Sequence, residues 1–147
     1  MVEKYKIPIR EIVKIKGGKD FETGDGQTIP NSELTLPPFR TRSYAYCSDT
    51  AYSEEIIELV KNVDILYHET TFLQKDSDLA AETLHSTSRE AAEIASKAGV
   101  RRLLIGHFSS RYKTYDTFEK EAQEVFPETS AVNDGDVFSV SRVREKM

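Results

Sequence analysis

The feature that most constrains this chain is a repeated arrangement of short apolar segments, each followed by side chains that can bind a metal or transfer a proton. The segments cover residues 43–47, 64–67 and 103–105, and the polar residues that follow them are Asp49, His68 with Glu69, and His107. Short apolar runs of this kind predict buried strands. Because open α/β folds keep their chemistry at the carboxyl ends of parallel strands, we expect Asp49, His68 and His107 to come together at one sheet edge.

Helical patterns alternate with these strands. Ser53 is the expected N-cap of the first helix, which carries acidic residues in its first turn. The expected helices cover residues 53–60, 91–99 and 117–126, and two further short β segments cover residues 130–132 and 137–140. This βαβαβα order predicts the α/β class, with a mostly parallel sheet and flanking helices.

Residues 1–42 follow a different pattern and are interpreted as an accessory segment, with the α/β domain over residues 43–147. The segment contains a short helix ended by glycines, a hairpin-like turn over residues 24–31, and an extended stretch at Pro37 and Pro38. It also holds a basic cluster for which two interpretations stay open, a local RNA contact or a solvated face: Lys4, Lys6, Arg10, Lys14, Lys16 and Lys19.

Composition narrows the functional classes. The formal net charge of −5 argues against nucleic-acid binding by bulk electrostatic attraction. The amino-terminal sequence has no signal-peptide pattern and no apolar run approaches the roughly 20 residues of a membrane helix, so the predicted location is the cytoplasm. The single cysteine, Cys47, lies in an apolar strand and is interpreted as a structural thiol.

All three histidines, His68, His85 and His107, fall at predicted strand ends or just before a helix. Asp49 suits a bridging carboxylate in a two-metal hydrolytic site, although a turn cap is the alternative, and His107 suits a terminal ligand. The pair His68 and Glu69 fits an orienting or proton-relay role. His85, ahead of a helix N-terminus, is placed to protonate a leaving group or stabilise an oxyanion.

This set of ligands is incomplete for two metals. The chain contains no H-x-H-x-D-H, H-E-x-x-H or Cys-x-x-Cys motif. Either these residues bind no metal, or another polypeptide segment supplies the remaining ligands.

Four motifs, at residues 46–50, 66–72, 85–87 and 104–112, resemble the C-terminal half of the ribonuclease Z family, the tRNA 3′-processing endonucleases of the metallo-β-lactamase superfamily. The resemblance implies half of a metallo-β-lactamase αββα sandwich and, in the complete protein, two Zn²⁺ ions. It also makes residues 1–42 a remnant of an insertion or arm. The implied site residues are Asp49 and His107 as metal ligands, His85, His68 and Glu69 in catalysis, and Ser109 and Arg111 at substrate phosphates. Independently of the resemblance, the helix end after His85 offers the backbone N–H groups of Ser86 and Thr87 to a phosphate.

The same resemblance implies hydrolysis of precursor tRNA 3′ of the discriminator nucleotide, in a homodimer. The sequence departs from the family by lacking the H-x-H-x-D-H half, so we expect that half as a partner and predict that this chain alone is inactive. Two alternatives stay open. One is another hydrolase of the superfamily, acting on small phosphodiesters or sulfate esters, and the other is a non-catalytic α/β module.

Overall fold

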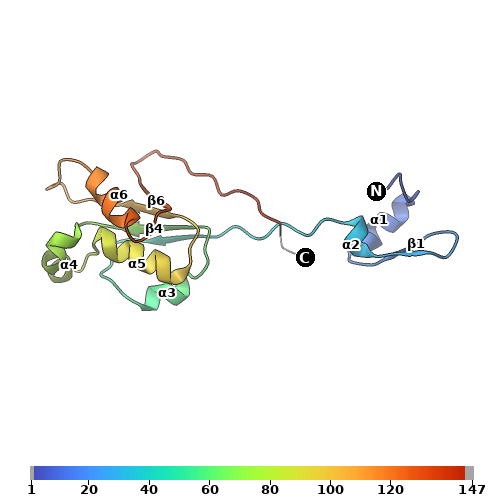
Figure 1. Cartoon of the computed structure of the whole chain (residues 1–147), viewed down its shortest axis with the longest axis horizontal. Helices are drawn as coiled ribbons and strands as arrows, with labels where there is room; N and C mark the ends of the chain where they lie inside the picture. The colour runs from blue at the N-terminus through green and yellow to red at the C-terminus, as the bar shows by residue number, and fades with distance from the viewer. Residues whose placement is uncertain (1, 145–147) are drawn as a thin grey trace. The chain divides into compact units, whose positions relative to one another are not determined.

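The computed structural model describes residues 2–144, which form two compact units (Figure 1). One unit combines the described parts of Met1–Arg40 and Arg142–Met147, and the other is Thr41–Ser141. Residues 142–144 therefore belong with the amino-terminal unit, whereas the sequence pattern had grouped them with the α/β domain.

The larger unit is built on a parallel four-stranded sheet in the order β3-β4-β5-β6. The strands are β3 (Tyr44–Cys47), β4 (Ile65–Glu69), β5 (Leu103–Gly106) and β6 (Thr129–Ala131). The register pairs Cys47 with His68 and Glu69 with Gly106. The carboxyl ends of β3, β4 and β5 therefore meet at one edge, and the predicted α/β fold with a parallel sheet is confirmed.

Helices α3 (Glu55–Leu59), α5 (Ser88–Ala98) and α6 (Asp116–Gln123) pack with the sheet around one apolar core. Helix α5 begins with a capping box between Thr87 and Glu90, and ends at Gly99 in the left-handed conformation. Its alanine-rich face allows close approach to β4 and β5. The fully buried large apolar side chains of the core, each stabilising the fold by about 1.5–3 kcal/mol, are Leu66, Ile94, Leu103, Ile105 and Phe118.

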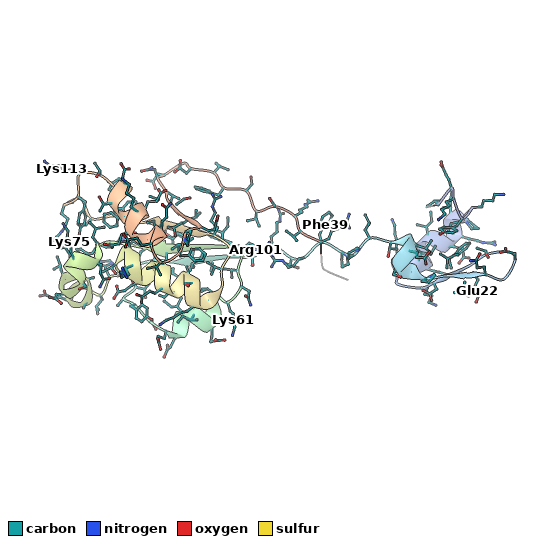
Figure 2. The ribbon with its side chains drawn as sticks, in the orientation of Figure 1. Glu22, Phe39, Lys61, Lys75, Arg101 and Lys113 are labelled. Atoms are coloured by element: carbon teal, nitrogen blue, oxygen red, sulfur yellow. The ribbon has the colours of Figure 1, made fainter. Side chains whose placement is uncertain are left out.

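Asp64 ties the strands together at their amino ends, away from the edge that carries the predicted site. Its Oδ2 atom accepts a hydrogen bond from the Ser43 amide at 2.9 Å, and its Oδ1 atom lies 3.4 Å from Nε of Arg101. Figure 2 shows Arg101 at the opposite end of this unit from Lys75 and Lys113. The buried Asp64 carboxylate therefore has a structural role, and the candidate functional residues lie at the opposite, carboxyl edge of the sheet.

Several local predictions were wrong. Helix α3 has Glu54 at its N-cap, without a side-chain cap, while Ser53 contributes only its carbonyl to the Ile56 amide at 3.3 Å. Residues 137–140, predicted as a β segment, form no strand, and among the described strands β6 pairs only with β5. The short segments η1 (Gln74–Asp76) and α4 (Ser77–Thr83) were not predicted, since neither is long enough to show a helical period.

The smaller unit contains α1 (Ile9–Lys16), an antiparallel pair of β1 (Phe21–Glu22) and β2 (Thr28–Ile29), and α2 (Asn31–Leu34). The predicted helix ended by glycines and the predicted hairpin are both confirmed. A small separate core joins these elements, and it consists of Ile7, Ile15, Phe21 and Ile29.

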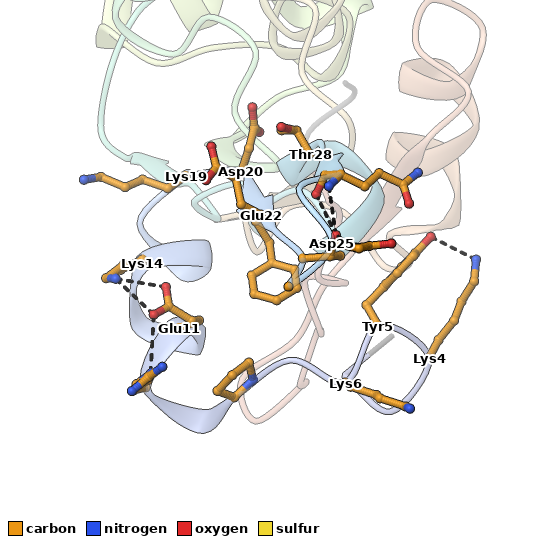
Figure 3. A pocket seen from close by; sticks show the side chains of 16 residues that line it. Lys4, Tyr5, Lys6, Glu11, Lys14, Lys19, Asp20, Glu22, Asp25 and Thr28 are labelled. Atoms are coloured by element: carbon orange, nitrogen blue, oxygen red, sulfur yellow. Dashed lines mark hydrogen bonds and ion pairs between the residues drawn. The ribbon is translucent and has the colours of Figure 1, made fainter.

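A cavity of the smaller unit is lined by much of the basic cluster (Figure 3). The lining is mixed in charge, because carboxylates lie among the cations, and Lys14 is already paired with Glu11 at 2.9 Å. The acidic lining residues are Glu11, Asp20, Glu22 and Asp25. An RNA contact in this unit stays a prediction, and the nearby carboxylates weaken the case for it.

Candidate metal centre

Three side chains converge at the carboxyl edge of the sheet. Asp49 follows β3, His107 follows β5, and His85 lies between α4 and α5. One ligand atom from each lies within 4.8 Å of the others. The structure thus brings Asp49 and His107 together, and the third member of the cluster is His85, whereas the sequence pattern had placed His68 there.

The backbone turns sharply at two of these residues. Asp49 has φ 49° and His107 has φ 63°, both in the left-handed region. Few non-glycine residues adopt this conformation, although Asp and His are among those that tolerate it best. Such a reversal directly after a strand holds each side chain over the sheet edge, and backbone strain of this kind concentrates at functional sites.

Glu69 organises the residues beneath the cluster. Its carboxylate is fully buried. The Oε1 atom accepts hydrogen bonds from the amides of Thr50 at 3.2 Å and Ser86 at 3.1 Å, and lies 2.7 Å from Nδ1 of His85. Oε2 accepts from the amide and hydroxyl of Thr71 at 2.8 and 2.9 Å. Since a carboxylate only accepts, Nδ1 of His85 donates, which leaves Nε2 with a lone pair.

The chemistry of the three converging groups fits a cation. Oδ1 of Asp49 lies 3.2 Å from Nε2 of His107, and the two histidine rings lie 5.3 Å apart between centroids. A carboxylate with two imidazoles is a donor set that Zn²⁺ takes readily. All three side chains are at least partly exposed, so an ion has access from solvent.

His68 lies away from this cluster. It is fully buried and shares the face of β4 that Leu66 presents to the core, as the two-residue alternation of a strand requires. Its Nδ1 atom lies 2.8 Å from the carbonyl oxygen of Glu69, and Nε2 has no hydrogen-bond partner in the described part of the chain. Burial lowers the pKa of His68, so the ring is held neutral inside the fold.

The predicted phosphate contacts divide into two groups. Ser86 and Thr87 are fully buried, and their hydroxyls donate to the Thr50 carbonyl at 2.6 Å and to Gln74 at 2.9 Å. The amides of both residues are also engaged, with Glu69 at 3.1 Å and Glu90 at 2.8 Å, so a phosphate contact at this helix end stays a prediction that these bonds weaken. Arg111, by contrast, is exposed and places its guanidinium 5.3 Å from the centre of the Phe72 ring.

Ser109 is intermediate in exposure, more accessible than the buried Ser86 and Thr87 and less accessible than Arg111. Its amide donates to the Thr71 carbonyl at 3.1 Å. The Phe72 ring, over which the Arg111 guanidinium lies, has its centroid 6.3 Å from the centroid of the His85 ring. Ser109 and Arg111 are therefore in the neighbourhood of the cluster and remain available to a ligand.

Thr50 and Thr71 are site residues to which the sequence patterns assigned no role. The Thr50 amide donates to Glu69, and its hydroxyl donates to the Ala51 carbonyl at 2.9 Å. Thr71 was given no role, although it lies two residues after Glu69 and so on the same side of an extended chain. The two-residue spacing between Glu69 and Thr71 was the feature of the sequence that could have predicted their contact.

An aromatic surface adjoins the cluster on the sheet face opposite the core helices. The rings of Tyr46 and Tyr67 stack at 4.6 Å, and 63% of Tyr46 is exposed. A Cβ atom at Gly106 would lie 2.7 Å from the Tyr67 hydroxyl, so any other residue there would force the tyrosine ring to shift. Burial is the main cause that raises the pKa of Tyr67 to about 12. A pocket lined by these tyrosines reaches His107.

Comparison with known proteins gives concordant matches. The profile of the family described as "Beta-lactamase superfamily domain" matches residues 10–108. A protein of Parabacteroides distasonis named ribonuclease Z is 49% identical over 140 residues, which cover 95% of this chain and 46% of that protein. Its namesake from Porphyromonas gingivalis is 51% identical over 132 residues, which cover 90% and 43%. The chain thus spans somewhat under half the length of these relatives.

Among solved structures, the metallo-beta-lactamase fold protein YhfI from Bacillus subtilis matches with a TM-score of 0.59 and 28% identity, over 63% of this chain and 37% of that one. The expected resemblance to ribonuclease Z and the expected half of a metallo-β-lactamase fold are therefore confirmed. Within residues 2–144, no helix has both the length and the apolar character needed to cross a bilayer.

Proposed function

Because this chain belongs to the beta-lactamase superfamily, we propose that it forms the part of a ribonuclease Z-type endonuclease that carries Asp49, His85 and His107. The observation that carries the proposal is the convergence of these three side chains within 4.8 Å at the carboxyl edge of the sheet. The names of the two bacterial relatives support the choice of ribonuclease Z within the superfamily.

Asp49 and His107 would hold the metal, with Asp49 as the bridging carboxylate and His107 as a terminal ligand. We propose Zn²⁺, two ions per complete site, because imidazole and carboxylate donors suit it. When bound, zinc supplies Lewis-acid polarisation of a phosphoryl oxygen and lowers the pKa of a water ligand to about 7. Both residues have the left-handed backbone conformation and their side chains converge at the same sheet edge, which supports this assignment.

His85 would act as the proton donor to the leaving oxygen in its imidazolium form, after Nε2 has taken a proton from solvent. Its Nδ1–H is held by Glu69 at 2.7 Å, so Nε2 is the atom available to the substrate. Glu69 acts as the positioning carboxylate, and His68 supports it from the core through the Glu69 carbonyl. His85 also lies within ligand distance of Asp49 and His107, so a role as third metal ligand is the competing assignment.

The proposed substrate is precursor tRNA, cut at the phosphodiester 3′ of the discriminator nucleotide. Arg111 is the proposed phosphate contact, because it is exposed and lies over Phe72 near His85. Ser109 is a second candidate. The proposed location is the cytoplasm.

The proposed partner is the half that carries H-x-H-x-D-H, because three donors are too few for two metal ions. The exposed aromatic surface around Tyr46 and Tyr67 adjoins His107, so a β layer seated there would also bring ligands to the metal centre. We propose that the chain is inactive without that half and that the complete enzyme is a homodimer.

The test is zinc analysis of this chain, alone and mixed with a fragment carrying H-x-H-x-D-H, with cleavage of precursor tRNA followed in parallel. The expected result is little zinc and no cleavage by the chain alone, and about two zinc ions and cleavage 3′ of the discriminator for the mixture. Preference of the mixture for a small aryl phosphodiester over precursor tRNA would show a different hydrolase of the superfamily. Absence of zinc from both samples would contradict the proposal.

A further inference from the structure

The hydroxyl of Thr71 lies between the buried carboxylate and the histidine at the exposed edge. Its Oγ1 atom is 2.9 Å from Oε2 of Glu69 and 2.8 Å from Nδ1 of His107. Thr71 is itself buried, with 8% of its surface exposed, so solvent does not compete freely for these bonds.

Counting protons settles the direction of both bonds. Glu69 accepts from three backbone amides, which can only donate, and from His85 and the Thr71 hydroxyl. If Thr71 instead donated its single proton to His107, its oxygen would face the Glu69 carboxylate at 2.9 Å with no proton between them. Thr71 therefore donates to Glu69 and accepts from Nδ1–H of His107.

We propose that Thr71 is a positioning residue that fixes the Nδ1-protonated tautomer of His107, so that the lone pairs of Nε2 and of Asp49 Oδ1, 3.2 Å apart, are both left for a cation rather than joined by a proton. One buried carboxylate, Glu69, then orients both histidines of the cluster, His85 directly and His107 through the Thr71 hydroxyl. The inference rests on the proposed function for its use, because a lone pair on Nε2 serves a metal ligand.

The test reads the tautomers directly, on the metal-free chain, from two-bond ¹H–¹⁵N correlations of the histidine rings at about pH 8.5, well above the ordinary imidazole pKa of about 6.5. In the wild-type chain we expect His85 and His107 both protonated at Nδ1. Thr71→Val removes the acceptor, so His107 should shift toward Nε2–H while His85 stays unchanged. A general disturbance of the loop would move both rings.

Two variants complete the design. Thr71→Ser keeps the hydroxyl and should restore the wild-type pattern. Thr70→Val is the matched control, because the neighbouring Thr70 hydroxyl donates only to the Gly106 carbonyl at 3.2 Å and should leave the His107 tautomer unchanged. An Nε2-protonated His107 in the wild-type chain would overturn the proposal, even if Thr71→Val failed to fold.

Zinc affinity of the complex with the H-x-H-x-D-H half separates this inference from the proposed function. Loss of a group that orients a metal ligand weakens binding by about 10–100-fold, so Thr71→Val should fall in that range and Thr70→Val should match the wild type. Equal affinity of Thr71→Val and the wild type would overturn the inference alone. Failure of the wild-type complex to bind zinc would remove the proposed function, and the tautomer result would stand.

Discussion

Nδ1 of His85 lies 2.7 Å from Oε1 of Glu69, a carboxylate that is fully buried and accepts two further bonds at the same oxygen. A carboxylate that accepts a hydrogen bond from one ring nitrogen fixes both the orientation and the tautomer of an imidazole. Four testable predictions follow from this pair and its surroundings.

Glu69→Gln should lower both activity and stability. A glutamine amide brings N–H donors against groups that themselves donate, so at least one buried hydrogen bond is lost, at a cost of about 1–3 kcal/mol. The turnover number of the assembled enzyme on precursor tRNA should fall by about 10–100-fold. Urea unfolding and single-turnover cleavage measure the two effects. Glu82→Gln, at an exposed position on α4, is the control and should change neither.

Replacement of Asp49 and His107 by alanine should abolish metal binding with little effect on folding. Both side chains are exposed, and surface substitutions usually change stability by no more than about 0.5 kcal/mol. Zinc content of the assembled enzyme and thermal unfolding of the chain check the two parts. Loss of fold stability with no change in metal content would favour a non-catalytic module in which these residues only cap turns.

His85→Gln distinguishes a proton donor from a metal ligand. As a proton donor, His85 contributes about 10²–10⁴-fold to the rate, and the variant should keep its zinc while the turnover number falls within that range. Zinc stoichiometry and turnover on precursor tRNA are measured on the same preparation. A variant that loses one zinc ion per site would assign His85 to the metal instead.

Stability should decrease as the pH falls below 6.5. Burial lowers the pKa of His68 from its ordinary value of 6.5. Just below pH 6.5 the unfolded chain therefore binds a proton on His68 more readily than the folded chain does, which favours unfolding. The contribution of His68 is fully present above pH 6.5 and is lost as the pH falls from 6.5 toward the lower folded-state value. Urea unfolding of the chain between pH 5 and 8 measures this slope, about where histidine titrates. His68→Asn should flatten it, and an unchanged slope in that variant would assign the effect to other groups.

Much of this architecture could be predicted from local signals. The strands at 65–69 and 103–106 are apolar runs bounded by polar residues, and α5 carries its own start and stop signals in Thr87, Glu90 and Gly99. Asp49 and His107 follow strands that lie in one parallel sheet, so their convergence also follows from sequence order. These features depend on neighbours in the chain and on a general rule of parallel sheets.

Tertiary structure alone decided which histidine joins them. His68 directly follows its apolar run, yet strand alternation turns its ring into the core beside Leu66. His85 reaches the cluster because α4, a helix too short to be predicted, returns the chain so that the His85 ring meets Glu69. The contact between Thr71 and His107 spans 36 residues and depends on the pairing of β4 with β5. Local patterns determine elements, whereas the meeting of polar atoms within hydrogen-bonding distance depends on how those elements pack.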